Sequence, residues 1–224
     1  EGGFSENSIA SLKAAQDAGL WGSECDVHLT ADNVIIVNHD AKISGKRIRN
    51  HPFSDFEEDL LPNGERRPTF DEYLTQAGEC RSTMLVVELK PQESEEVEDL
   101  LVDKVLASVK EHRMYNNRRI GFISFSKHIC CRIAVEAPGF VNQYLNGDLS
   151  PQELKELGIN GMDYHFMVMR IHSNWIREAA DLGISTNTWT VNNEAVARVM
   201  ASLGVGALTT NDPLMVRNLF SDKK

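Results

Sequence analysis

Short apolar runs alternate with amphipathic stretches along the whole chain. This alternation is typical of βα units built around a parallel sheet, and it predicts an α/β fold. Near the start, Ile9, Leu12 and Ala15 recur close to the helical period and predict a first helix. Ser5 is its expected N-cap, and Gly19 is expected to end it.

Seven apolar runs predict strands that each lead into a helix. The expected strands cover residues 22–29, 84–89, 120–125, 140–145, 159–164, 185–189 and 205–209. One expected helix follows Pro91 and runs to about His112. Five others are expected to begin near Lys127, Ser150, Asn174, Asn193 and Asp212.

Two segments depart from the regular βα pattern. Residues 34–37 form a short extended excursion after the strand 22–29. Residues 41–68 carry glycine, proline and mixed charge without a sustained period, and they predict a loop-rich insertion that ends in a helix over 69–77. The rest of the chain is expected to form one domain, residues 1–224, which is a length that α/β barrels reach undivided.

A closed (β/α)8 barrel needs eight strands, whereas the pattern supplies seven. The chain opens with a helix that no strand precedes, so we expect strand one to lie ahead of Glu1. A barrel without that strand would expose unpaired edges. Protein that starts at Glu1 is therefore expected to be poorly soluble and inactive.

Charge and hydropathy exclude two classes of protein. The chain has 23 basic and 33 acidic residues, for a net charge of −10, and no long Lys/Arg run. It lacks the basic footprint of a nucleic-acid binder. No apolar stretch is long enough to span a bilayer, so we expect a soluble protein, periplasmic or secreted if a signal segment has been removed. The four cysteines show neither zinc-ligand spacing nor the density of a disulfide scaffold.

Charged residues inside the expected strands suggest a metal site. Alternate side chains of a strand share a face, so Glu24 points with Asp26, and Glu88 points with Lys90. Burying these charges is costly unless a cation and an anion join them. A divalent metal and a phosphate would satisfy the set, and three carboxylates favour Mg²⁺ or Ca²⁺ over zinc. The alternative is that these carboxylates only form salt bridges to Lys90 or to an arginine.

Three further residues are candidates for a role in the site. His39 follows the extended excursion and stands next to Asp40. Imidazole is the side chain best suited to proton transfer at neutral pH. His28 shares the face of the two acidic residues on its strand and can line the same pocket. Lys90 can neutralise a phosphoryl oxygen, unless it is an ordinary exposed strand-end ammonium.

Motifs spread over essentially all 224 residues resemble the glycerophosphodiester phosphodiesterase family. They are Ser5-Glu6-Asn7, Glu24-x-Asp26, Thr30, His39-Asp40, Glu88-x-Lys90, Ser124-Phe125, Trp189-Thr190-Val191-Asn192 and Thr210-Asn211-Asp212-Pro213. The resemblance implies a TIM barrel that hydrolyses glycerophosphodiesters to glycerol 3-phosphate and an alcohol with one bound divalent cation, in lipid and glycerol metabolism.

The resemblance also implies roles for individual residues. Glu24, Asp26 and Glu88 match metal ligands, and His39 matches one of two catalytic histidines. The remaining matches concern the substrate: Glu6 to a carboxylate near the phosphate and metal, Lys90 to a phosphate-stabilising position, and Trp189 to an aromatic residue beside the alcohol part. Trp189 is equally readable as a core aromatic.

The family's other catalytic histidine belongs to a His-Arg-Gly motif at the end of strand one, ahead of Glu1. The nucleophile is either water or the substrate's own adjacent hydroxyl. Two other functions stay open: a phospholipase D-like lyase on the same scaffold, and a non-catalytic phosphate-binding module if the natural chain lacks His-Arg-Gly.

Overall fold

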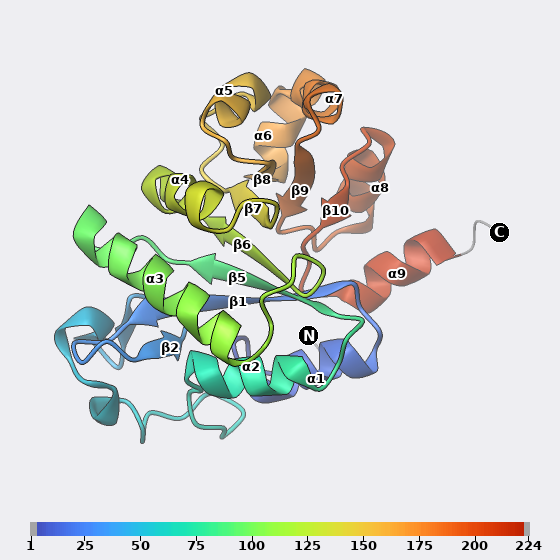
Figure 1. Ribbon diagram of the computed structural model, residues 1–224. Helices are drawn as coiled ribbons and strands as arrows, with labels where there is room; N and C mark the ends of the chain where they lie inside the picture. The colour runs from blue at the N-terminus through green and yellow to red at the C-terminus, as the bar shows by residue number, and fades with distance from the viewer. Residues whose placement is uncertain (1–3, 222–224) are drawn as a thin grey trace. The chain divides into compact units, whose positions relative to one another are not determined.

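The computed structural model describes residues 4–221, which fall into two compact units. The first unit extends to Phe122 and includes Ala137–Phe140. The second comprises Ile123–Glu136 and the chain from Val141 onward. A single domain over 1–224 stays a prediction. Figure 1 labels the elements.

The first unit carries every residue of the expected metal site. Its elements are α1 (Ile9–Asp17), β1 (Gly22–Leu29), β2 (Ile35–Val37), β3 (Lys42–Ile43), β4 (Lys46–Arg47), the 3-10 helices η1 (Ile48–Asn50) and η2 (Phe53–Asp55), α2 (Phe70–Gly78), β5 (Met84–Leu89) and α3 (Glu95–Glu111). Strand β1 pairs in parallel with β5 on one side and antiparallel with β2 on the other. Strand β6 (Ile120–Ser124) crosses the boundary between the units.

Helix α1 begins one turn later than the sequence pattern predicts. Ser8 is its N-cap, with the side-chain oxygen accepting a hydrogen bond from Ser11 N at 3.0 Å. The prediction of Ser5 as the cap is wrong, because Asn7 has a φ of 58° and the helix can start only after this left-handed residue. The Ser5 hydroxyl oxygen instead accepts a hydrogen bond from Asn63 N.

The insertion 41–68 is more ordered than its composition predicts. Strands β3 and β4 form a hairpin whose two turn residues, Ser44 and Gly45, both have positive φ, as a tight two-residue turn requires. A small apolar core holds the segment in place, formed by Ile36, Ile43, Ile48 and Phe56. The segment then leads into α2, where Thr69 and Glu72 form a capping box.

Strand β1 separates an apolar face from a polar one. Cys25, Val27 and Leu29 are fully buried on one face, as a strand covered by helices requires. The acidic residues and His28 alternate with them and therefore share the opposite face. The sheet thus places the candidate site on the side away from this apolar row.

The second unit repeats the βα pattern. Its elements are α4 (Lys127–Glu136), β7 (Val141–Tyr144), α5 (Pro151–Glu156), β8 (Gly161–His165), α6 (Phe166–Ile171), α7 (Ser173–Leu182), β9 (Ser185–Trp189), α8 (Glu194–Ser202), β10 (Ala207–Leu208) and α9 (Pro213–Ser221). Strands β7 to β10 pair in parallel in chain order. The expected helix near Asn174 is preceded by a second short helix, α6, and the expected strand 205–209 shortens to β10.

All seven strands expected ahead of helices are present within residues 4–221, and the excursion is the antiparallel strand β2. This confirms the prediction of an α/β fold. The expected first strand lies ahead of Glu1 and therefore outside the described residues.

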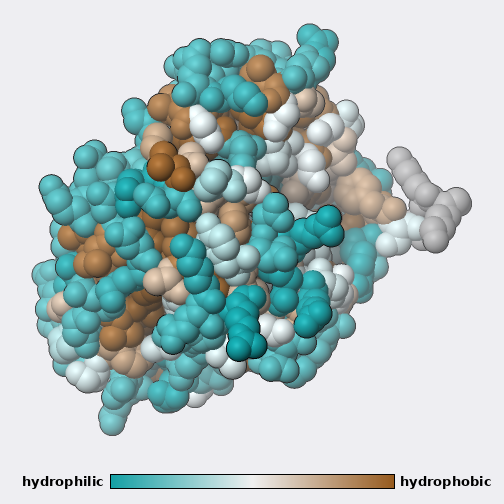
Figure 2. All heavy atoms as spheres, in the orientation of Figure 1, coloured by the Kyte–Doolittle hydropathy of each residue, from teal (hydrophilic) through white to brown (hydrophobic). Residues whose placement is uncertain are grey.

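Across the described part of the chain, none of the helices has the length and apolarity needed to cross a membrane. The face drawn in Figure 2 is mostly hydrophilic, with apolar side chains in separate patches.

Candidate active site

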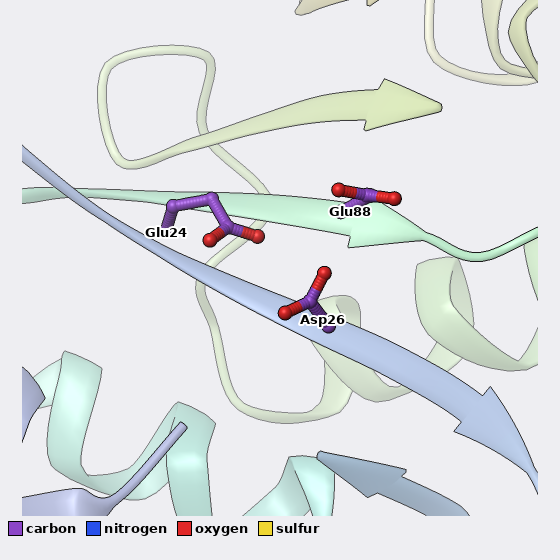
Figure 3. Close-up of side chains that lie close together, drawn as sticks. All are labelled: Glu24, Asp26 and Glu88. Carbon is purple, nitrogen blue, oxygen red and sulfur yellow. The ribbon is translucent and has the colours of Figure 1, made fainter. Parts of the chain in front are cut away.

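Strands β1 and β5 bring three carboxylates together. Their parallel register sets Asp26 directly beside Glu88, and Glu24 lies two residues earlier on the same face of β1. One oxygen atom of each carboxylate lies within 4.8 Å of the others. Figure 3 shows the three side chains converging from the two strands. Asp26 and Glu88 are buried, while Glu24 is exposed.

Lys90 completes the charge cluster from the residue after β5. Its Nζ lies 2.8 Å from Asp26 Oδ1 and 2.8 Å from Glu88 Oε1, and its side chain is only 12% exposed. The alternative of an exposed strand-end ammonium is therefore wrong. The salt bridges foreseen as an alternative to a metal do form, between Lys90 and the carboxylates of Asp26 and Glu88.

Burial and neighbouring charges shift the titration of the cluster. Burial is the main cause that raises the pKa of Glu88 to about 7; Lys90 opposes this rise, and nearby Asp26 adds to it. Burial alone would lower the pKa of Lys90, but the charges of Asp26 and Glu88 outweigh it and leave the pKa above its ordinary value. A cation held by these carboxylates would remove the cost of ionising Glu88.

The carboxylates fit a hard divalent cation. Asp26 Oδ1 and Glu88 Oε1 are buried and accept no hydrogen bond of regular geometry from the described residues; their contact is the ion pair with Lys90. All three ligands of the triad offer oxygen, which Mg²⁺ and Ca²⁺ prefer. The convergence expected from strand alternation is confirmed, and both the binding of a metal and its identity stay predictions.

Asn7 orients one ligand, although the sequence pattern gave it no role. Its Nδ2 donates to Asp26 Oδ2 at 2.8 Å, and its Oδ1 accepts from Asp26 N at 3.0 Å. The positive φ of Asn7 turns this side chain back toward β1. The available signal was its place in the Ser5-Glu6-Asn7 motif. Neighbouring Glu6 is exposed, and its expected place near the phosphate stays a prediction.

His39 follows β2 with its side chain 57% exposed. Its Nδ1 lies 3.0 Å from Asp40 Oδ1, so Nε2 is the ring nitrogen that does not face this carboxylate. The preceding residue ties this turn to the ligand strand, because Asn38 N donates to Asp26 O at 3.0 Å. The structure thus links the His39 turn to β1, which carries Asp26, and the part of His39 in catalysis stays a prediction.

His28 contacts the backbone of the His39 turn. Its Nε2 lies 3.3 Å from His39 O, and the residue is only 5% exposed. Burial lowers the pKa of His28 to about 4, so the ring is neutral at physiological pH. His28 therefore contacts the His39 turn as a buried, neutral side chain.

Trp189 belongs to the second unit, at the end of β9. Its Nε1 donates to Asp163 O at 2.8 Å. Its ring packs edge-on against Phe125 and His165, with centroids 5.7 and 5.2 Å apart. Trp189 thus forms part of an aromatic cluster at the carboxyl ends of strands in that unit. Its expected contact with the alcohol part of a substrate stays a prediction.

Comparison with known proteins identifies the class of fold and site. The profile of the glycerophosphoryl diester phosphodiesterase family matches residues 1–215. A glycerophosphodiester phosphodiesterase from Parabacteroides distasonis is 37% identical, superposes with a TM-score of 0.96, and is matched over 100% of this chain and 94% of its own. These findings define the class of protein: an α/β barrel enzyme with an acidic site on its strands.

The chain belongs to the glycerophosphoryl diester phosphodiesterase family. A glycerophosphodiester phosphodiesterase from Caldanaerobacter subterraneus subsp. tengcongensis is 24% identical over 96% of this chain and 91% of its own length. An Oleispira antarctica phosphodiesterase, solved with the product sn-glycerol-3-phosphate, shares the fold with a TM-score of 0.85 at 21% identity, over 99% of this chain and 93% of its own. The predictions of the family, the TIM-barrel fold and an enzyme are confirmed.

Proposed function

We propose that this protein hydrolyses glycerophosphodiesters to glycerol 3-phosphate and an alcohol, with one divalent cation held by Glu24, Asp26 and Glu88. The observation that carries the proposal is the triad itself: two buried carboxylates converge with a third beside them, and Lys90 pairs with the two buried ones. Family membership supplies the reaction class. The sn-glycerol-3-phosphate product named for the Oleispira antarctica enzyme supports the choice of substrate.

The cation, either Mg²⁺ or Ca²⁺, would supply Lewis-acid stabilisation of the charge that develops on a phosphoryl oxygen. Lys90, already poised between two ligands, would donate to a phosphoryl oxygen on the same side of the site. Asn7 would keep Asp26 in the ligating orientation through its paired hydrogen bonds. Glu6 and Trp189 are proposed to contact the phosphate side and the alcohol side of the substrate, respectively.

His39 is the proposed acid or base. Asp40 faces Nδ1 and orients the ring, so proton transfer would occur at Nε2. The attacking group is either water or the substrate's own hydroxyl, and the second would produce a cyclic phosphate first. The partner for the other proton transfer is the histidine of the family's His-Arg-Gly motif.

Product analysis of the natural full-length chain tests the proposal. Glycerophosphocholine, glycerophosphoethanolamine and glycerophosphoinositol are incubated with the chelated enzyme, with and without added Mg²⁺ or Ca²⁺. Release of glycerol 3-phosphate that depends on the metal and is lost in Asp26→Asn supports it, with the exposed Glu58→Gln as a matched control. Turnover that survives chelation and Asp26→Asn contradicts the metal part of the proposal, and the absence of glycerol 3-phosphate from all three substrates contradicts the reaction.

A further inference from the structure

The insertion returns to the site as a third strand-like segment beside β2. Val37 N donates to Pro68 O at 3.0 Å, and an antiparallel bridge joins Ile36 to Thr69. The other side of β2 pairs with β1. The segment 67–69 thus lies against β2 just where the chain turns toward His39.

Asn38 connects this segment to the turn that carries His39. Its Oδ1 accepts a hydrogen bond from Arg67 Nη1, and its Nδ2 donates to Asp40 O at 2.6 Å. Its backbone N donates to Asp26 O at 3.0 Å. Asn38 is only 6% exposed, so its own end of each hydrogen bond is buried. The Asn38 side chain therefore links Arg67, which binds its Oδ1, to the backbone carbonyl of Asp40 on the far side of His39.

Arg67 occupies an unusual setting for a guanidinium. Its Nε is buried and has no acceptor among the described residues, and burial lowers the pKa of the group. The adjacent Arg66 is different: its side chain is 61% exposed and reaches Glu72 across 3.4 Å. Two neighbouring arginines thus differ in environment, and only Arg67 contacts the His39 turn.

We infer that Arg67, acting through Asn38, is a positioning residue that holds the His39 turn in register with the ligand strand. This inference rests on the proposed function, because it assigns His39 a task that needs accurate placement. Without the guanidinium, the Asn38 carboxamide loses the partner that fixes its orientation, and its bond to Asp40 O weakens. A displacement of about 1 Å can cost about 10²-fold in rate.

The kinetic test compares Arg67→Ala with Arg66→Ala in the natural full-length chain. The expected result for Arg67→Ala is a kcat lower by roughly 10- to 100-fold, with KM and the affinity for Mg²⁺ or Ca²⁺ nearly unchanged. Arg67→Lys keeps a donor and should recover part of kcat. Asn38→Asp keeps the acceptor for Arg67 but loses the donor to Asp40, so it should also lower kcat. Arg66→Ala should match the wild type in every measurement.

An NMR measurement separates this inference from the proposed function. The imidazole Cε1–H signal of His39, assigned with His39→Gln, is followed in the metal-free protein. It should shift or broaden in Arg67→Ala and Asn38→Asp and stay unchanged in Arg66→Ala. An inactive wild type would refute the proposed function, while the NMR comparison would still decide the placement of His39. Unchanged His39 signals together with wild-type kcat in both Arg67 variants would overturn the inference; Arg67→Lys decides if Arg67→Ala does not fold.

Discussion

Acid stability offers a sharp test of the environment of His28. The group has an ordinary pKa of 6.5, and burial lowers the pKa in the folded protein to about 4. Because the folded pKa is the lower one, the contribution of the neutral ring is fully present above 6.5. It is lost as the pH falls through 6.5 toward 4. A difference of about 2.5 in pKa corresponds to about 3 kcal/mol, since one pKa unit is about 1.4 kcal/mol.

Glu88 changes stability in the opposite direction over part of the same range. Its folded pKa of about 7 exceeds its ordinary 4.5, so ionising Glu88 costs stability as the pH rises toward 7, and acidification relieves that cost. The two groups partly offset each other in the metal-free wild type. The contribution of His28 is therefore measured by comparing a His28 variant with the wild type.

The assay is urea unfolding of the metal-free protein at a series of pH values between about 7.5 and about 4. His28→Gln removes the titrating ring and keeps an amide that can donate to His39 O. Its unfolding free energy should fall less on acidification than that of the wild type, by up to about 3 kcal/mol. His51→Gln is the control, because His51 pairs with Asp55 at the surface and packs edge-on against Phe56, away from the carboxylate cluster. Parallel curves for His28→Gln and the wild type would refute the reasoning.

The remaining predictions concern the ligands and the proton transfer. Asn7→Ala should lower the unfolding free energy by about 1–3 kcal/mol and weaken metal binding, because buried Asp26 loses two hydrogen bonds. Urea unfolding measures the first effect and calorimetric titration the second. Wild-type values in both would contradict the role of Asn7. His39→Ala should lower turnover by about 10²–10⁴ with metal affinity intact, whereas equal losses of both would make His39 a ligand or a structural residue. Added Mg²⁺ or Ca²⁺ should raise the melting temperature of the wild type but not of Asp26→Asn, and an equal rise in both would move the ion elsewhere.

Local patterns predicted the strands, and the shared face of Glu24 and Asp26, because both follow from short-range periodicity. Alternation along β1 puts Glu24 and Asp26 on one face whatever the rest of the fold does. The pairing of Asp26 with Glu88 depends on the parallel register of β1 and β5, which are separated by the insertion and α2. The family motifs supplied what periodicity alone could not.

The residues that sequence reasoning missed act through long-range hydrogen bonds. Asn7 reaches Asp26 because its own backbone is left-handed, and the same conformation delays α1 until after Ser8. Arg67 reaches Asn38 across the whole insertion, and no spacing rule connects two such positions. Polar side chains at unusual backbone angles and in irregular loops carry no periodic signal, so their partners appear only in three dimensions.

The measurement that tests the central claim most directly is calorimetric titration of Mg²⁺ and of Ca²⁺ into the chelated wild type and into Glu88→Gln, with glycerophosphodiesterase activity measured on the same samples. The account predicts one bound ion per chain in the wild type, restored activity on binding, and loss of both in Glu88→Gln. Full activity of the metal-free wild type, or wild-type ion binding by Glu88→Gln, would contradict it.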